Sequence, residues 1–266
     1  MKLAIIGGGN MAEAILQGVL SGKLLAAAEI MIADVSAERL KYLAEKYGVQ
    51  TTANNLQALR AAENVLLAVK PQVSAGVIDE IQAAGKTEQL IITIAAGVPM
   101  SRIDVRQNRK VARVMPNTPA LVGQAASAVC FNERVSAADK TFTLELLRSI
   151  GAVVEVDEKE LNAVTGLSGS GPAFVFRLMD YFIQAGVSLG LPEAKARTLT
   201  YQTFLGSALL ADRSGRPLEE LIAQVTSPGG TTQAGREVLE KSAAGQILRD
   251  TLVRAKERAD ELEKGK

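Results

Sequence analysis

The chain opens with Leu3-Ala4-Ile5-Ile6-Gly7-Gly8-Gly9-Asn10-Met11-Ala12, an apolar run that leads directly into three glycines. The stretch is typical of a buried strand, a tight turn and the start of a helix. Its spacing matches G-x-G-x-x-A, in which the first glycine allows the turn, the second admits a pyrophosphate, and the alanine lets the helix pack on the strand. An ordinary strand–helix turn is the alternative. We expect a dinucleotide to bind here, at Gly7, Gly8, Gly9, Asn10 and Met11.

An acidic residue, Asp34, ends the next apolar run, 27 residues after Gly7, where the usual spacing is about 20. Its carboxylate is suited to accept both hydroxyls of an adenosine ribose and to repel a 2′-phosphate, which favours NAD over NADP. The alternative is a solvated aspartate that caps the following helix, expected over Ser36–Tyr47. Arg39 lies one turn inside that helix and could reach a 2′-phosphate, so the sequence leaves both NADPH and NADH open as cofactors.

Further apolar runs alternate with helical patterns as far as about residue 157. Continuous apolar strands separated by helices indicate a parallel sheet covered on both faces. The expected strands are Leu3–Ile6, Ile30–Ala33, a short one near Val49–Thr51, Val65–Val69, Leu90–Ile94, Val111–Met115, Ala126–Phe131 and Ala152–Val156. A helix over Ser136–Ser149 separates the last two. The first half of the chain is therefore predicted to be a Rossmann-type, doubly wound sheet.

The loops that follow these strands should gather at one edge of the sheet, where such folds bind their ligands. Small residues and prolines in them would let a flat ring approach the backbone. Any one of these loops could be an ordinary turn, and Lys70 could contact a cofactor phosphate or only solvent. Their common position at one edge favours cofactor contacts at Asn55, Ala68, Val69, Lys70, Pro71, Ala95, Ala96, Gly97 and Asn117.

Beyond residue 157 the strand patterns stop and helical periodicity continues to the end. We predict an α/β chain with a dinucleotide-binding domain over residues 1–157 and an all-helical domain over residues 158–266. The segment Ser168–Ala173 opens the first long helix, with a flexible interdomain joint as the alternative. A second segment, Val225–Thr232, is rich in glycine and hydroxyl groups and precedes a helix over Thr232–Lys241. It predicts an anion pocket suited to a substrate carboxylate, with a capped turn as the alternative.

Composition narrows the function. The 30 Lys and Arg residues balance 29 Asp and Glu, aromatics are 4%, and Trp is absent, which argues against nucleic acid and membrane surfaces as partners. Histidine is absent, which removes Ser-His-Asp triads and His-ligated metals, and no metal site is expected. The single cysteine, Cys130, is expected to be buried. The apolar segment Ala173–Leu191 carries Arg177 and Asp180, so we expect a buried helix and a soluble, cytoplasmic protein.

At these residues the sequence resembles the pyrroline-5-carboxylate reductase family, over essentially the whole chain. Arg236 departs from the family pattern, which usually has an aliphatic residue there, and puts local packing in question more than activity. The motifs that carry the resemblance are Gly7–Ala12, Ala68–Pro71, Ala95–Gly97, Met115–Pro119, Thr165–Ala173 and Val225–Thr232.

The resemblance implies reduction of 1-pyrroline-5-carboxylate to L-proline by hydride transfer from NADPH or NADH, the final step of proline biosynthesis. It implies catalytic roles for Thr232 and Ser227, with the Thr232 hydroxyl near the imine nitrogen. The residues implied to hold the substrate are Gly229, Gly230, Thr231 and Ser170. It also implies a homodimer with interlocked helical domains, which can assemble further into a decamer. A cyclic imine that arrives protonated needs positioning more than a strong acid, so a chain without histidine can reduce it.

Three other functions compete with this one. A reductase of a related cyclic imine acid would use the same site. A β-hydroxyacid dehydrogenase has a similar layout but uses a lysine on the first long helix of its second domain, and no lysine occurs here between Lys159 and Lys195. A non-catalytic NAD(P)-binding sensor would need the glycine turn alone, and the Val225–Thr232 segment argues against it.

Overall fold

The computed structural model describes residues 1–84 and 86–264, which divide into two compact units. Of the described residues, those up to 170 and those in 254–264 form the first unit, and Gly171–Val253 form the second. This division by contacts assigns residues 158–170 to the same unit as the sheet. The domain boundary at residue 157 was placed by sequence pattern and stays a prediction.

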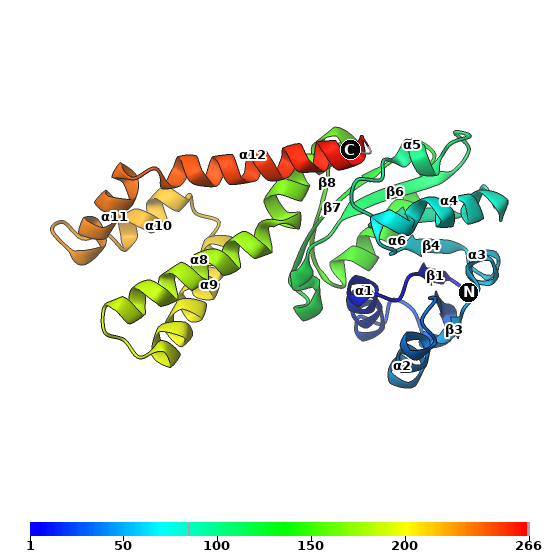
Figure 1. The fold of residues 1–266 in the computed structure, drawn as a ribbon, viewed down its shortest axis with the longest axis horizontal. Coiled ribbons are helices and arrows are strands. Elements are labelled where there is room, and N and C mark those ends of the chain that lie inside the picture. Colours follow the sequence, from blue (N-terminus) through cyan, green and yellow to red (C-terminus); the bar gives the residue numbers. More distant parts are fainter. Residues whose placement is uncertain (85, 265–266) are drawn as a thin grey trace. The chain divides into compact units, whose positions relative to one another are not determined.

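The first unit is built on an eight-stranded sheet with the order β3-β2-β1-β4-β5-β6-β7-β8 (Figure 1). The first six strands are all parallel, as predicted, and their order is that of a dinucleotide-binding fold. The strands are β1 (Leu3–Ile6), β2 (Ile30–Ala33), β3 (Gln50–Thr52), β4 (Asn64–Leu67), β5 (Leu90–Thr93), β6 (Lys110–Met115), β7 (Ala125–Phe131) and β8 (Gly151–Glu155).

One of the two later strands, whose direction the sequence did not predict, departs from the parallel arrangement: β7 runs antiparallel to β6. The connection between them is short and holds only a 3₁₀ helix, Thr118–Val122. A parallel neighbour needs a longer crossover, whereas a short connection can reverse the chain. The last strand, β8, is again parallel to β7 because α6 (Ala137–Arg148) links the two.

Strand β1 shows why the apolar runs are continuous. Leu3 and Ile5 belong to one hydrophobic cluster and Ala4 and Ile6 to another, and all four side chains are at most 1% exposed. Alternate residues of a strand point to opposite faces, so both faces of this strand are covered. The first cluster includes residues of α1 (Asn10–Ser21) and α6, and the second includes residues of α3 (Asn55–Ala61) and α4 (Ser74–Ala83).

The short helices α5 (Met100–Ile103) and α7 (Leu161–Val164) complete the unit, and a π-helical turn, Thr165–Gly169, follows α7 directly. Sequence patterns predicted the start of a long helix here but not this wide turn. A Cβ on Gly169 would lie 3.3 Å from the sulfur of Met115, so the turn packs against the end of β6. Turns of this kind are frequent at functional sites.

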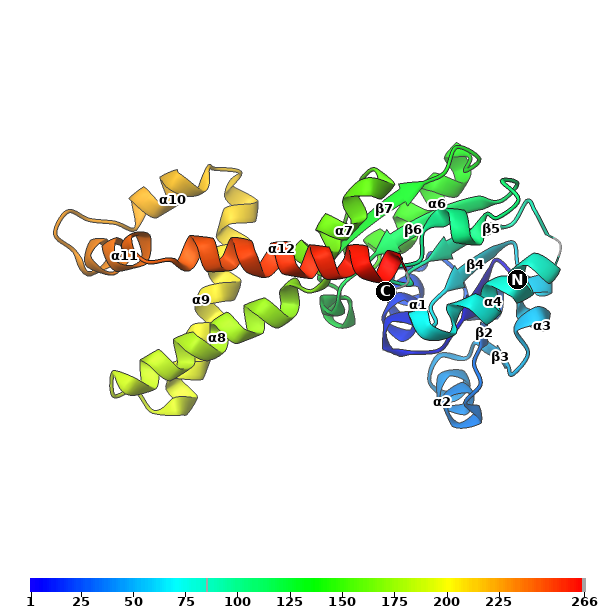
Figure 2. The same cartoon turned by 45° about the horizontal axis from the view of Figure 1, so that its top comes forward.

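The second unit is all-helical (Figure 2). Its helices are α8 (Gly171–Ser188), α9 (Glu193–Ser214), α10 (Leu218–Gln224), α11 (Thr231–Lys241) and the first half of α12 (Ala244–Glu263). The rings of Phe182 and Phe204 meet edge to face at 5.1 Å between α8 and α9. Many large apolar side chains of the unit remain exposed, among them Phe176, Leu205 and Ile247. Among the described residues, no helix is both long and apolar enough to cross a membrane.

The last turns of α12 are anchored in the first unit by a buried cation. The Arg113 side chain on β6 is 4% exposed and pairs with Glu158 at 2.9 Å and with Glu263 at 2.7 Å. Asn162 donates to Asp260 at 2.8 Å and to the other oxygen of Glu263 at 2.6 Å. This network explains why residues near the end of the chain belong to the unit that contains the sheet.

We predict that Arg113→Met destabilises the protein by about 3 kcal/mol, because it leaves two carboxylates without their buried partner. Urea unfolding at fixed protein concentration measures this loss. The matched control is Lys159→Met, which breaks the exposed pair between Lys159 and Asp157 and should cost less than about 0.5 kcal/mol. Equal losses in the two variants would contradict the assignment of Arg113 as the anchor.

Candidate functional site

The glycine turn has the geometry that the sequence predicted. Gly7 has φ +95°, and a Cβ there would lie 2.9 Å from the carbonyl carbon and oxygen of Ala68. The turn after β1 is therefore in close contact with the chain leaving β4, and only glycine fits at that position. Gly9 precedes α1, no side chain caps the helix, and a Cβ on Gly9 would meet no atom within 4 Å. The space and the N–H groups that a pyrophosphate needs are thus present.

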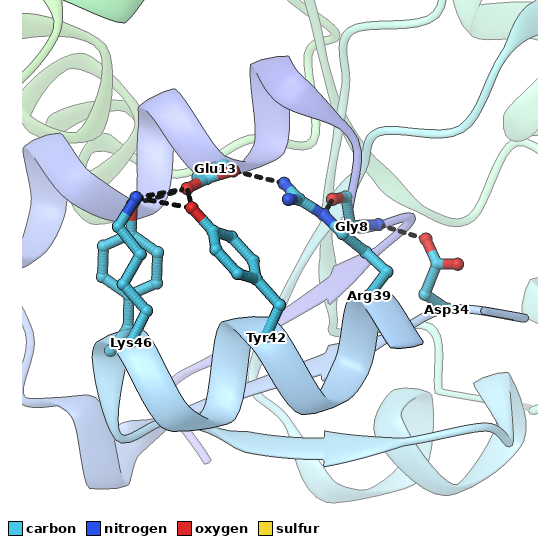
Figure 3. Close-up of polar contacts among 7 residues, drawn as sticks. Gly8, Glu13, Asp34, Arg39, Tyr42 and Lys46 are labelled. Atoms are coloured by element: carbon cyan, nitrogen blue, oxygen red, sulfur yellow. Dashed lines mark hydrogen bonds and ion pairs between the residues drawn. The ribbon is translucent and has the colours of Figure 1, made fainter. Parts of the chain in front are cut away.

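Gly8 connects this turn to Asp34 (Figure 3). Its N–H donates to one carboxylate oxygen of Asp34 at 2.6 Å, and the N–H of Ser36 donates to the other at 2.9 Å. The cap of α2 (Ala37–Tyr47) is Ser36, whose hydroxyl accepts from the N–H of Arg39. The alternative in which Asp34 is a solvated cap of this helix is therefore wrong. Asp34 is partly buried beside the glycine turn, and its contact with a ribose stays a prediction.

A cluster that sequence reasoning missed lies next to this turn, around Glu13 on α1 (Figure 3). Its carboxylate accepts from Arg39 at 2.5 Å, Tyr42 at 3.0 Å, Lys46 at 3.0 Å and Tyr47 at 2.8 Å. Burial opposes ionisation of Glu13, but the hydrogen bonds from these four side chains outweigh it and lower the pKa to about 2. The spacing of Arg39, Tyr42 and Lys46 along one helix face was the available signal.

The residues predicted to contact the cofactor after β3, β4 and β6 differ in exposure and in their hydrogen bonds. Lys70 is exposed, and Pro71 begins a 3₁₀ turn. Asn55 donates to Glu80 on α4 at 2.7 Å. The amide of Asn117 is engaged at both ends, since it accepts from the N–H of Ala126 at 2.9 Å and donates to the carbonyl of Ser168 at 3.1 Å. Asn117 thus joins the end of β6 to β7 and to the π-helical turn.

Three predicted residues meet in one cavity of the first unit, with a volume of about 170 Å³. Ala96 and Gly97 come from the loop after β5, and Ser170 ends the π-helical turn. Gly97 has φ +71°, and a Cβ there would lie 3.3 Å from that of Leu262 on α12. The lining residues that the sequence did not single out are Thr165, Ala255, Arg258, Ala259 and Leu262.

The remaining predicted residues lie together in the second unit, in the turn between α10 and α11. Gly229 has φ +70°, and a Cβ on Gly230 would clash with the hydroxyl of Ser227. The N–H of Gly230 donates to the carbonyl of Ser227 at 3.0 Å, which closes the turn. No side chain caps α11. The exposed hydroxyls, which make no hydrogen bond to any residue that the structure describes, are those of Ser227, Thr231 and Thr232.

Cys130 is 3% exposed, as the sequence predicted. Burial raises the pKa of its thiol to about 12. The thiol is therefore protonated at neutral pH and is no candidate for nucleophilic chemistry.

Comparison with known proteins decides the family. The chain is 40% identical over 265 residues to the pyrroline-5-carboxylate reductase of a Synechocystis species, an alignment that covers 99% of both proteins. It is 37% identical to that of Methanosarcina acetivorans, over 99% of this chain and 98% of the relative. The chain belongs to the pyrroline-5-carboxylate reductase family. The resemblance found in the motifs is confirmed. The function of the chain is the reduction of pyrroline-5-carboxylate to proline with NAD(P)H.

Profiles and solved structures of this family agree with the fold. A profile described as pyrroline-5-carboxylate reductase dimerisation matches residues 158–262, and one described as NADP oxidoreductase, coenzyme F420-dependent, matches residues 2–97. The reductase structure from Coxiella burnetii is 34% identical and superimposes with a TM-score of 0.93 over 98% of both chains. That from Plasmodium falciparum, which has NADP bound, is 27% identical with a TM-score of 0.87 over 99% of this chain and 98% of that one.

Two glycine variants test the turn. Gly9→Ala should keep the fold, at a cost below about 1 kcal/mol for a poorer helix cap. Its methyl group would occupy the space for the pyrophosphate and should weaken NAD(P)H binding about tenfold or more. Gly7→Ala should instead destabilise the protein by about 1–3 kcal/mol, because of its positive φ and its contact with Ala68. Thermal unfolding and calorimetric titration separate the two effects, and unaltered affinity in Gly9→Ala would exclude this turn as the pyrophosphate site.

Proposed function

We propose that the substrate carboxylate binds at the turn Ser227–Thr232 and that the Thr232 hydroxyl lies beside the imine nitrogen. The observation that carries this proposal is the uncapped start of α11, where a tight glycine turn and three exposed hydroxyls coincide. Free N–H groups at a helix start attract a carboxylate, and a hydroxyl can donate to or accept from the nitrogen as its charge changes. Ser227 would orient the ring, and Thr231 would hold the carboxylate at the helix start. Gly229 and Gly230, whose N–H groups donate to Gln233 at 2.8 Å and to Ser227 at 3.0 Å, would shape the turn around the carboxylate.

The first unit would hold the cofactor in this proposal. The turn Gly7–Met11 binds the pyrophosphate and Asp34 the ribose. Ala96 and Gly97 would contact the cofactor at the cavity that they line together with Ser170, and Ser170 would contact the substrate. Ala68–Pro71, Asn55 and Asn117 shape the loops around it. When bound, NAD(P)H supplies the hydride that reduces the imine carbon. With no histidine and with Cys130 protonated, the contribution of the chain is positioning, exclusion of water and hydrogen bonding to the nitrogen.

Thr232→Ala should lower kcat by about tenfold or more, the usual effect of losing a group that assists proton transfer. Oxidation of NADH and NADPH in the presence of pyrroline-5-carboxylate measures it. The control is Thr198→Ala on α9, whose hydroxyl donates to the carbonyl of Ala194 at 3.0 Å and which should retain full activity. Normal kcat in Thr232→Ala would remove this hydroxyl from the reaction. A wild-type protein that oxidises neither cofactor would overturn the proposed substrate.

We also propose that the chain is a homodimer with interlocked helical units, and that such dimers can assemble into a decamer in the cytoplasm. The dimerisation profile and the exposed apolar side chains of α8 and α9 support the dimer. A lone, buried cysteine is compatible with a reducing compartment.

Sedimentation equilibrium should give a mass of at least twice the 28.1 kDa of one chain. The exposed apolar surface would have to remain in water if the chain stayed single, which costs free energy. A monomer at micromolar concentration would contradict the dimer, and a discrete species of ten chains would establish the decamer.

A further inference from the structure

The Glu13 cluster has an uneven arrangement of donors. One carboxylate oxygen, Oε1, accepts from Tyr42, Lys46 and Tyr47, whereas Oε2 accepts only from Arg39. The Glu13 side chain is 15% exposed and that of Arg39 is 24% exposed. Glu13 would therefore keep three partners if Arg39 moved away, whereas Arg39 would lose its only carboxylate among the described residues.

Arg39 is also tied to the phosphate turn. Its Nε donates to the carbonyl oxygen of Gly8, the residue whose N–H donates to Asp34 (Figure 3). The guanidinium lies over the ring of Tyr42, 5.0 Å from its centroid. A guanidinium has more N–H donors than these two hydrogen bonds use, so Arg39 can still bind an anion. Gly8 thus holds the negatively charged Asp34 and the positively charged Arg39 beside the place where this fold binds the adenosine ribose.

The four charged side chains around Gly8 and Glu13 have no net charge. Asp34 and Glu13 are negative, and Arg39 and Lys46 are positive. Without the charge of Glu13, the region would carry an uncompensated positive charge beside the ribose. NADPH differs from NADH by a 2′-phosphate with about two negative charges, so its binding depends on this balance far more than that of NADH does.

We propose that Glu13 is a specificity-determining residue: by pairing with Arg39 it lowers the affinity for a 2′-phosphate and so sets the preference between NADPH and NADH. Glu13 acts through Arg39 and is a positioning residue rather than a ligand of the cofactor. This inference rests on the proposed binding of NAD(P)H at the glycine turn. The low pKa of Glu13, about 2, keeps the pair charged throughout the neutral range, so the effect is constant there.

The test measures dissociation constants of NADP⁺ and NAD⁺ by calorimetric titration, which does not depend on turnover. Glu13→Gln keeps the shape of the side chain and removes its charge. It should strengthen NADP⁺ binding relative to NAD⁺ by about fivefold, the size expected for one partly exposed ion pair. Arg39→Gln should weaken NADP⁺ binding and leave NAD⁺ nearly unchanged. In the double variant, the effect of Glu13→Gln should vanish if it is transmitted through Arg39.

Two controls separate charge from structure. Glu45→Gln removes an exposed carboxylate from α2, the helix that carries Arg39, where Glu45 pairs with Lys41 at 3.8 Å. This variant should not alter the ratio of the NADP⁺ and NAD⁺ dissociation constants. Tyr47→Phe removes one hydrogen bond to Glu13 without changing the charge. The ratio of the two dissociation constants should stay within about twofold of the wild-type value. The inference would be overturned if Glu13→Gln left the ratio of dissociation constants unchanged. It would also be overturned if Glu13→Gln changed that ratio equally in the wild-type protein and in Arg39→Gln. Normal cofactor binding together with a normal kcat in Thr232→Ala would instead refute the proposed substrate site and leave this inference intact.

Discussion

Burial of β1 on both faces is the constraint on which the first unit depends. Four consecutive apolar residues at the centre of the sheet have no exposed side, so helices must cover both faces and each of its parallel neighbours must be reached through a crossover. Parallel strands then end at the same edge. The turn after β1 meets the chain leaving β4 at that edge, and the close contact between Gly7 and Ala68 is the direct result.

Sequence patterns predicted the parts of the fold that depend on burial. All eight strands were predicted, with ends displaced by at most two residues. The central strands were recognisable because a strand buried on both faces is a continuous apolar run, whereas the edge strands β3 and β8 are only partly buried. The direction of β7 was not predictable in the same way, since it is determined by the path of the connection and not by hydrophobicity. The strand Val65–Val69 ends early, at Leu67, because the chain turns at Ala68 to pack against Gly7.

The site was predictable where local conformation decides it. Gly7 and Gly229 adopt the positive φ that only glycine accepts readily, and such positions can be recognised from spacing. The spacing of Arg39, Tyr42 and Lys46 along α2 was visible in the sequence, but Glu13 could not be identified as their shared partner. That role arises from the approach of α1 to α2 in three dimensions. Asn117 was identified as a cofactor contact, yet both ends of its amide bind backbone groups. Polar residues at strand ends can serve the loops themselves, and sequence does not separate that role from ligand binding.

The anchoring of α12 has a consequence for how the chain is made. Glu158 follows Arg113 after 45 residues, whereas Glu263, its other partner, follows after 150. During synthesis Arg113 can therefore pair with one carboxylate well before the second exists. The whole second unit, Gly171–Val253, is made before the segment of α12 that completes the first unit, and this long-range contact adds to the entropy cost of folding. A first unit held by one ion pair thus precedes the complete unit during synthesis.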